Sequence, residues 1–302
     1  MFNPSIQEEK GEPVIIERAQ PGKPHAGKTF AAIQAHADDV SFFCAGTSAK
    51  VIEKGYTGYL IQTTNDDKCG PTPSIGETVL SNEREVEELA RLLGLKKCYF
   101  LGYRNHFQDG DSPLELRARL IFLFRLLKVD TVLTFNPWGH WEENPDHWVT
   151  AQAVEAAAWM AGMDKDYPEH FDAGLEPHTV KERYFWVARK NQPYNRIVDV
   201  SAYTETMVAA MSVHKSQGPG GSSGRRLKAR LAAQGLRLPA LDGDDEAADR
   251  QYIRLFLMPM YEKLGQAYGL KAAEPFYYFG PAYGEEASAI EQYVAEHAVP
   301  LQ

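Results

Sequence analysis

The sequence has 302 residues and contains no apolar run of 18 residues, the length that a membrane-spanning helix requires. Its first 28 residues place four charged side chains between positions 8 and 12, where a secretory signal peptide needs an apolar core. There are only three cysteines, widely spaced and without a CxxC pair. Such a sparse, odd set indicates reduced thiols rather than disulfides or a zinc framework. We therefore expect a cytoplasmic protein.

An excess of basic residues is also absent. Acidic residues number 41 against 32 basic ones, and the net charge is −9. Proteins that bind nucleic acid or anionic membranes need clusters of Lys and Arg for the phosphates, so the composition argues against both partners. The sequence has no GxGxxG motif, and it therefore gives no support for a dinucleotide cofactor.

The length and the 44% of hydrophobic residues are sufficient for a large buried core. Residues 1–28 contain four prolines and are interpreted as an N-terminal extension, and residues 29–302 as a single α/β domain. Composition changes at Gln217, where glycines, a short basic segment and an acidic segment follow one another. We interpret residues 217–249 as a loop insertion, which is either a lid over the substrate, a subunit contact or a solvated excursion with paired charges.

The most informative stretch is TFAAIQAHADDVSFFCAGT, residues 29–47. An apolar run typical of a buried strand leads into a turn that carries His36, Asp38 and Asp39, and a helix follows. Ligands of α/β proteins bind at the carboxyl ends of parallel strands. One imidazole and two carboxylates at this place favour a metal-assisted hydrolase, in which one Asp is a ligand and the other a base. The alternative is that Asp38 or Asp39 caps the helix.

A second strand, loop and helix follow about a hundred residues later, in VDTVLTFNPWGHWEENPDHWVTAQAV, residues 129–154. Here the helix begins close to Asp146 and His147. In a parallel sheet this unit would deliver His147 to the same edge as His36, so the two halves of one site can meet.

These two motifs resemble the signatures of the LmbE-like, or PIG-L, family. AHADD with a later GT is similar to the family's AHPDD and GGT, and NPDH is similar to its HPDH. NEREVEELARLLGLKKCYFLGY resembles its Arg-x-x-Glu helix, and DVSAYTETMVAAMSVHKSQ its late segment with His-x-Ser-Gln. The resemblance covers residues 29–217. It implies a Rossmann-like three-layer α/β fold with a mostly parallel central sheet, and a zinc-dependent N-deacetylase of N-acetylglucosaminyl compounds.

The resemblance also implies roles for individual residues. His36, Asp39 and His147 would bind one Zn²⁺ per chain, and Asp38 would be the general base. Such a division agrees with the chemistry of metal sites, because a bound metal lowers the pKa of its water to about 7 and a neighbouring carboxylate can then remove the proton. Fe²⁺ or another divalent metal is an alternative to zinc.

The sequence departs from the family pattern at three positions. Ala37 replaces the proline of AHPDD, which we expect to matter little. Asn144 replaces the first His of HPDH, a group thought to stabilise the oxyanion; an amide can donate that hydrogen bond but cannot transfer a proton. His140 could take over the role if its loop folds back. Asn105 stands where the family often has Asp, so the activity could be altered.

Four further residues are predicted to contact the substrate. Arg84 matches the family's Arg. Trp138 and Trp141 lie near NPDH, and an indole ring can stack on a sugar. His214 either satisfies the carbonyl groups that end its helix, the simpler reading, or lines the pocket, as the family match suggests.

The sequence thus predicts a metal-dependent hydrolase that removes an acetyl group from an N-acetylglucosamine-like substrate. Two alternatives stay open: an amidase for a larger amide such as a thiol conjugate, and a carbohydrate-binding protein with impaired catalysis. The expected partner is a small N-acylated sugar, without nucleic acid or membrane, and a homo-oligomer is compatible with the sequence.

Overall fold

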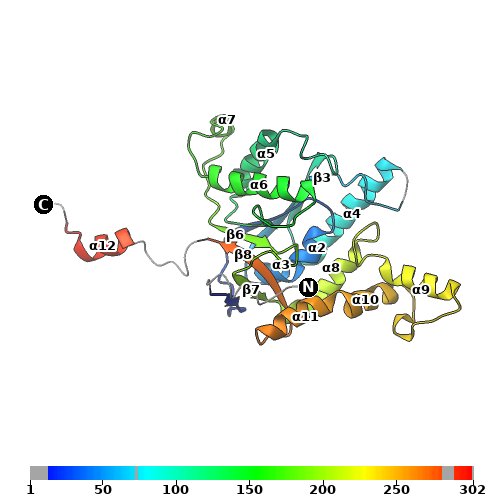
Figure 1. The fold of residues 1–302 in the computed structure, drawn as a ribbon. Helices are drawn as coiled ribbons and strands as arrows, with labels where there is room; N and C mark the ends of the chain where they lie inside the picture. Colours follow the sequence, from blue (N-terminus) through cyan, green and yellow to red (C-terminus); the bar gives the residue numbers. More distant parts are fainter. Residues whose placement is uncertain (1–12, 72–73, 281–288, 301–302) are drawn as a thin grey trace.

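The computed structural model describes residues 13–71, 74–280 and 289–300. An eight-stranded sheet runs through this part of the chain in the order β1-β7-β8-β6-β5-β2-β3-β4 (Figure 1). The strands are β1 (Ile15–Glu17), β2 (Thr29–Gln34), β3 (Thr57–Thr64), β4 (Lys97–Tyr103), β5 (Thr131–Phe135), β6 (Glu182–Trp186), β7 (Arg196–Asp199) and β8 (Ala273–Phe279). All neighbouring strands are parallel except that β8 runs antiparallel to both β6 and β7. The predicted mostly parallel α/β sheet is confirmed.

Helices cover both faces of the sheet, as Figure 1 shows. One layer contains α5 (Pro113–Leu127) and α6 (Pro145–Met160), and the other contains α2 (Asp39–Phe43), α3 (Ala45–Glu53), α4 (Ile75–Leu93), α8 (Thr204–Val213) and α11 (Met258–Ala267). The side chains of β2 alternate between the two cores: Phe30 and Ala32 pack against the second layer, Ala31 and Ile33 against the first. A strand buried on both faces explains the unbroken apolar run in the sequence.

The remaining short elements are α7 (Glu169–Asp172), η1 (Ser201–Tyr203), α9 (Ser223–Ala233), η2 (Pro239–Leu241), α10 (Asp245–Phe256) and α12 (Ala289–His297). Within the described residues, none of the helices is both long and apolar enough to cross a bilayer.

The strand order places the candidate site. β2 pairs with β3 on one side and with β5 on the other, so the chain reverses its direction of progress through the sheet at β2. In open α/β sheets the crevice at such a point, beyond the carboxyl ends of the strands, is where ligands bind. His36 follows β2 and His147 lies beyond β5, so the topology brings both predicted halves to this crevice.

Three details differ from the sequence-based expectations. The pattern of residues 81–93 predicts a helix capped by Ser81, but α4 begins at Ile75 because the side chain of Ser74 caps it by accepting a hydrogen bond from the backbone of Glu77. The pattern of residues 249–264 predicts one amphipathic helix, but the structure breaks it at Leu257, just before Pro259. The aromatic residues 276–279 are predicted to form an edge strand, but they belong to β8, which lies between β6 and β7. A last helix is predicted for residues 285–298, of which residues 285–288 lie outside the described residues.

Residues 217–249 contain α9, η2 and the start of α10. Ionic contacts tie this segment together: Arg225 of α9 pairs with the buried Asp249 at 2.7 Å, and Arg237 pairs with Asp242 at 3.3 Å. The basic and acidic runs of the sequence therefore meet in space. Gln217 and Pro219, at the start of the segment, reach the cavity described below.

Candidate metal centre and active site

The turn after β2 is organised by Asp39. Its Oδ2 accepts hydrogen bonds from the backbone N–H groups of Ala35 at 3.0 Å and of His36 at 2.8 Å. Asp39 thus holds the turn that precedes α2 instead of capping the helix. Asp38 occupies the N-cap position, but its side chain makes no capping hydrogen bond. The alternative that either carboxylate is simply a helix cap is therefore wrong.

The second half of the site begins at α6. Asn144 caps this helix, because its Oδ1 accepts a hydrogen bond from the N–H of Asp146 at 3.0 Å, and Pro145 follows at the first helical position. His147 therefore lies in the first turn of α6. Its ring stacks on that of Phe135 from β5, with centroids 3.9 Å apart. Helix capping and aromatic stacking fix the direction of this imidazole.

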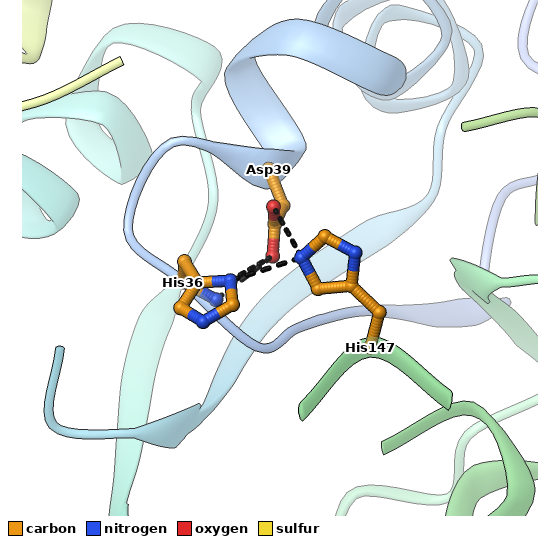
Figure 2. Close-up of side chains that lie close together, drawn as sticks. All are labelled: His36, Asp39 and His147. Atoms are coloured by element: carbon orange, nitrogen blue, oxygen red, sulfur yellow. Dashed lines mark hydrogen bonds and ion pairs between the residues drawn. The ribbon is translucent and has the colours of Figure 1, made fainter. Parts of the chain in front are cut away.

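The two halves meet at one buried point, as Figure 2 shows. His36 Nδ1 and His147 Nε2 are 3.0 Å apart, and the two Asp39 oxygens lie 3.8 Å from these nitrogens, Oδ2 from His36 and Oδ1 from His147. Ligands of a tetrahedral zinc ion, each about 2.0–2.1 Å from the metal, are separated by about 3.3 Å. The observed distances bracket this value, so a metal ion fits between the three side chains.

Each histidine has a carboxylate on its other ring nitrogen. His36 Nε2 lies 3.2 Å from Asp146 Oδ2, and His147 Nδ1 lies 3.1 Å from Glu142 Oε1. Such pairs fix the tautomer and orientation of metal-binding imidazoles. Glu142 was not predicted as a site residue. Its closeness in sequence to NPDH was the available signal, but a glutamate in an acidic loop is ordinarily solvated.

The charge of the site also suits a cation. Burial alone would lower the pKa of His36, but the hydrogen bond to Asp146 and the charges of Asp39 and Asp66 raise that pKa to about 10. Burial and the neighbouring carboxylates of Asp39 and Asp66 raise the pKa of Asp38 to about 7. Without a metal, this group of carboxylates therefore attracts a proton to His36, and a divalent cation would supply the missing positive charge.

A cavity of about 310 Å³ opens beside these residues. It is lined by His36, Asp38, Asp39, Phe42, Phe43, Cys69, His106, Asn144, His147, Gln217 and Pro219. Asp38 and Asn144, predicted as catalytic residues, thus share one cavity with the three predicted ligands. His106 and Gln217 were not predicted. Gln217 belongs to a segment that resembles the family, but His106 carried no signal in the sequence.

The other predicted residues lie elsewhere. Arg84 is exposed on α4, whereas Asn82, two residues earlier, is buried and donates to the carbonyl of Cys69 at 2.9 Å. Trp138, Trp141 and His140 are exposed and are not among the lining residues.

His214 is buried, and burial lowers its pKa to about 3. Neither of its ring nitrogens has a hydrogen-bond partner among the described residues. The expectation that its side chain satisfies helix carbonyls is therefore wrong. It does not line the cavity either.

Asp66 explains two departures from the family pattern. Its Oδ2 accepts hydrogen bonds from the backbone of Ala37 at 2.9 Å and from the side chain of Gln217, and its Oδ1 accepts from Asn105 Nδ2 at 2.6 Å. A proline at position 37 has no N–H to donate. An aspartate at position 105 would place a second negative charge against Asp66, which an amide avoids.

Parts of the sequence match a known protein family and several characterised deacetylases. The PIG-L family, described as GlcNAc-PI de-N-acetylase, matches residues 31–158. The diacetylchitobiose deacetylase of Thermococcus kodakarensis is 30% identical over 193 residues, which cover 62% of this chain and 69% of that protein. A 1D-myo-inositol 2-acetamido-2-deoxy-alpha-D-glucopyranoside deacetylase of a Mycobacterium species is 26% identical over 233 residues, with 61% and 72% covered.

Among solved structures, the N,N'-diacetylchitobiose deacetylase of Pyrococcus horikoshii superposes with a TM-score of 0.66 over 84% of each chain. At 24% identity, this likeness supports the fold.

Proposed function

Because this chain belongs to the PIG-L family of deacetylases, we propose that it removes the acetyl group from the amide nitrogen of an N-acetylglucosamine-like sugar, with one zinc ion. The observation that carries the proposal is the convergence of His36, Asp39 and His147 at one buried point. Relatives named for diacetylchitobiose and for an acetamido-glucopyranoside of inositol support the choice of sugar.

Zinc suits these donors because two imidazoles and one carboxylate leave a fourth coordination position open. Fe²⁺ or another divalent ion accepts the same ligands. When bound, the metal polarises the amide carbonyl and makes a water acidic enough to act as nucleophile near neutral pH. The protein itself orients the proposed metal ligands through Asp146 and Glu142, and it transfers the proton from the attacking water to the leaving amine.

Asp38 is the residue that handles the proton. It lines the cavity directly beside the ligand Asp39. A cation nearby favours its ionised form, so the carboxylate can accept a proton from the attacking water. The same carboxyl then donates that proton to the nitrogen of the departing amine, which leaves as the sugar amine while acetate is released.

The cavity suits a single sugar unit. Its volume of about 310 Å³ lies at the lower end of the usual range of ligand sites, about 300–1,000 Å³. Phe42, Phe43 and Pro219 give it an apolar side, against which a sugar ring can pack. For any second unit of the substrate we propose Trp141, because its indole is 75% exposed on the loop that also carries Glu142.

We further propose a cytoplasmic location. Cys44, Cys69 and Cys98 are all free thiols, and Cys69 lines the cavity. Free cysteines are the normal state in a reducing compartment.

The test is amine release from N-acetylated amino sugars by zinc-loaded protein, with and without a chelator. We expect release that depends on the metal. Asp38→Asn should lower kcat by roughly 10²- to 10⁴-fold while the metal content stays at one ion per chain. Asp111→Asn, at an exposed residue that is not among those lining the cavity, is the matched control and should be unaffected. Turnover that survives both chelation and Asp38→Asn would contradict the proposal.

A further inference from the structure

Asn144 leaves a chemical role open in this cavity. Its carbonyl oxygen is engaged at the start of α6, where it accepts the hydrogen bond from Asp146. Asparagine is one of the best residues for this capping position, so capping alone accounts for its presence. An oxyanion that develops on the substrate needs a hydrogen-bond donor that is held in place before the reaction. The cavity contains another side chain that can be this donor.

His106 is the imidazole that lines this cavity in addition to the two proposed ligands. Its ring centroid lies 6.3 Å from that of His36, with the rings nearly perpendicular. One ring nitrogen of the exposed His106, one of His36 and an Asp146 oxygen all lie within 4.8 Å of one another. A group bound next to His36 is thus within reach of the His106 side chain.

The backbone of His106 is held by Asp146, the carboxylate that also contacts His36. Its backbone N–H donates to Asp146 Oδ2 at 2.6 Å, and the same oxygen lies 3.2 Å from His36 Nε2. One buried carboxylate oxygen therefore ties the backbone of His106 to a proposed ligand. A donor that must meet a carbonyl oxygen at a defined place gains from such an anchor.

The backbone of His106 is also in an unfavourable conformation. Its φ is +60°, in the left-handed region that glycine occupies without cost and that other residues seldom adopt. A side chain kept at such a position is a reason to look for a function.

We propose that His106 is a catalytic residue whose imidazole N–H donates a hydrogen bond to the carbonyl oxygen of the scissile amide as negative charge develops there. It would supply the donor that the family takes from the first His of HPDH. The inference rests on the proposed function, because it assumes an acyl substrate in this cavity.

The same geometry also offers His106, His36 and Asp146 as a group that could hold a further cation. The hydrogen bonds argue against it. If His36 Nδ1 faces the first metal, its Nε2 carries the proton that Asp146 accepts. A second cation would have to displace that proton and compete with the backbone N–H of His106 for the same oxygen.

The experiment compares zinc-loaded wild type with His106→Ala and His106→Gln. We expect His106→Ala to lower kcat by roughly 10²- to 10³-fold with little change in KM, and His106→Gln to restore part of the loss because its amide can donate. Phe107→Ala, on the neighbouring exposed side chain, is the control for disturbance of the loop and should leave kcat unchanged. His106→Gly should melt at the same or a higher temperature than wild type, because glycine adopts the positive φ of this position without steric cost.

Two further measurements distinguish a catalytic role of His106 from a structural one. With an N-trifluoroacetyl substrate, whose oxyanion needs less stabilisation, the loss in His106→Ala should be smaller than with the N-acetyl substrate. Metal content should be one ion per chain in wild type and in all variants. A fall from two ions to one in His106→Ala would make His106 a metal ligand, and wild-type kcat in that variant would also overturn the proposal.

The proposal can fail independently of the proposed function. If wild type ignores N-acetyl sugars but hydrolyses 4-nitrophenyl acetate, the sugar deacetylase is refuted, and the same variants still test the donor with the ester. A protein inert towards both would overturn both.

Discussion

Removing the negative charge of Glu142 tests whether the acid that faces His147 tunes the metal centre. Among the described residues, three hydrogen-bonding groups contact the Glu142 side chain, and all of them contact Oε1. This oxygen lies 3.1 Å from His147 Nδ1, 2.7 Å from Arg189 Nη2 and 3.2 Å from the backbone N of Asn144. Oε2 has no partner among the described residues. In Glu142→Gln the amide oxygen can keep the place of Oε1 and the amide nitrogen can take that of Oε2, so the variant removes the charge and preserves the acceptor.

The expected magnitude follows from this geometry. Loss of an outer partner of a metal-binding histidine weakens metal affinity by about 10- to 100-fold, or ~1.4–2.8 kcal/mol. We expect Glu142→Gln near the lower end and Glu142→Ala, which also removes the acceptor, near the upper end. Burial alone would raise the pKa of Glu142, but the hydrogen bond to His147 and the charge of Arg189 lower it, so the carboxylate is ionised at neutral pH.

The assay is competition between metal-stripped protein and a chromogenic zinc chelator. Glu143→Gln is the matched control. The Glu143 side chain is 88% exposed, and its Oε1 lies 3.9 Å from Arg189 Nη2, so this ion pair is weak. Removing its charge should leave zinc affinity unchanged. Urea denaturation of the metal-free proteins separates folding from binding, because a buried amide without an acceptor costs about 1–3 kcal/mol. If Glu142→Gln binds zinc as tightly as wild type, the carboxylate does not act on the metal through His147.

Two other predictions concern groups outside the ligand set. Burial raises the pKa of Glu274 to about 7. The folded protein therefore binds this proton more tightly than the unfolded chain does. The free energy of unfolding should fall as pH rises from about 4.5 to about 7, by up to about 3 kcal/mol. Urea denaturation at about pH 4 and about pH 8 should show this loss in wild type and not in Glu274→Gln; equal pH dependence in both would exclude Glu274. Gly218 has φ +82°, and an added Cβ would lie 2.9 Å from Asp38 Oδ2, so Gly218→Ala should lower kcat at least ~10-fold with metal content unchanged. Gly235→Ala has φ +70° and no atom within 4 Å of the added Cβ, and an equal loss of activity in this control would mean that backbone strain, not contact with the base, is responsible.

Much of the site could be predicted from the sequence because the residues that can hold a metal follow strands. The buried run of β2 and the β-branched run of β5 are each recognisable locally, and a loop with polar residues follows each of them. Parallel strands present their carboxyl ends at one edge, so His36 and His147 had to approach each other. The start of α5 was equally readable: Ser112 caps this helix by accepting a hydrogen bond from the backbone N–H of Glu115, and Pro113 follows it.

The sequence could not decide which face of a helix turns inward. Residues two apart on an α-helix point about 200° apart, so an exposed side chain can stand two positions from a buried one. Arg84 and Asn82 are such a pair. Arg84, which was predicted to contact the substrate, is exposed, whereas Asn82 is buried under the site. The strand β8 is a similar case. Its aromatic run predicts a strand, but nothing local specifies that it inserts antiparallel between β6 and β7.

The supporting residues of the site depended entirely on tertiary structure. Glu142 meets Arg189, 47 residues away, and the backbone of His106 meets Asp146 across 40 residues. No periodicity or spacing encodes such contacts, because each requires two separate loops to be held by the sheet. The sequence by itself determined the sheet, the crevice and the three residues that can hold a metal. Only the folded chain decided which carboxylates contact the two histidines and which further imidazole lines the cavity, since burial and direction arise when distant segments pack together.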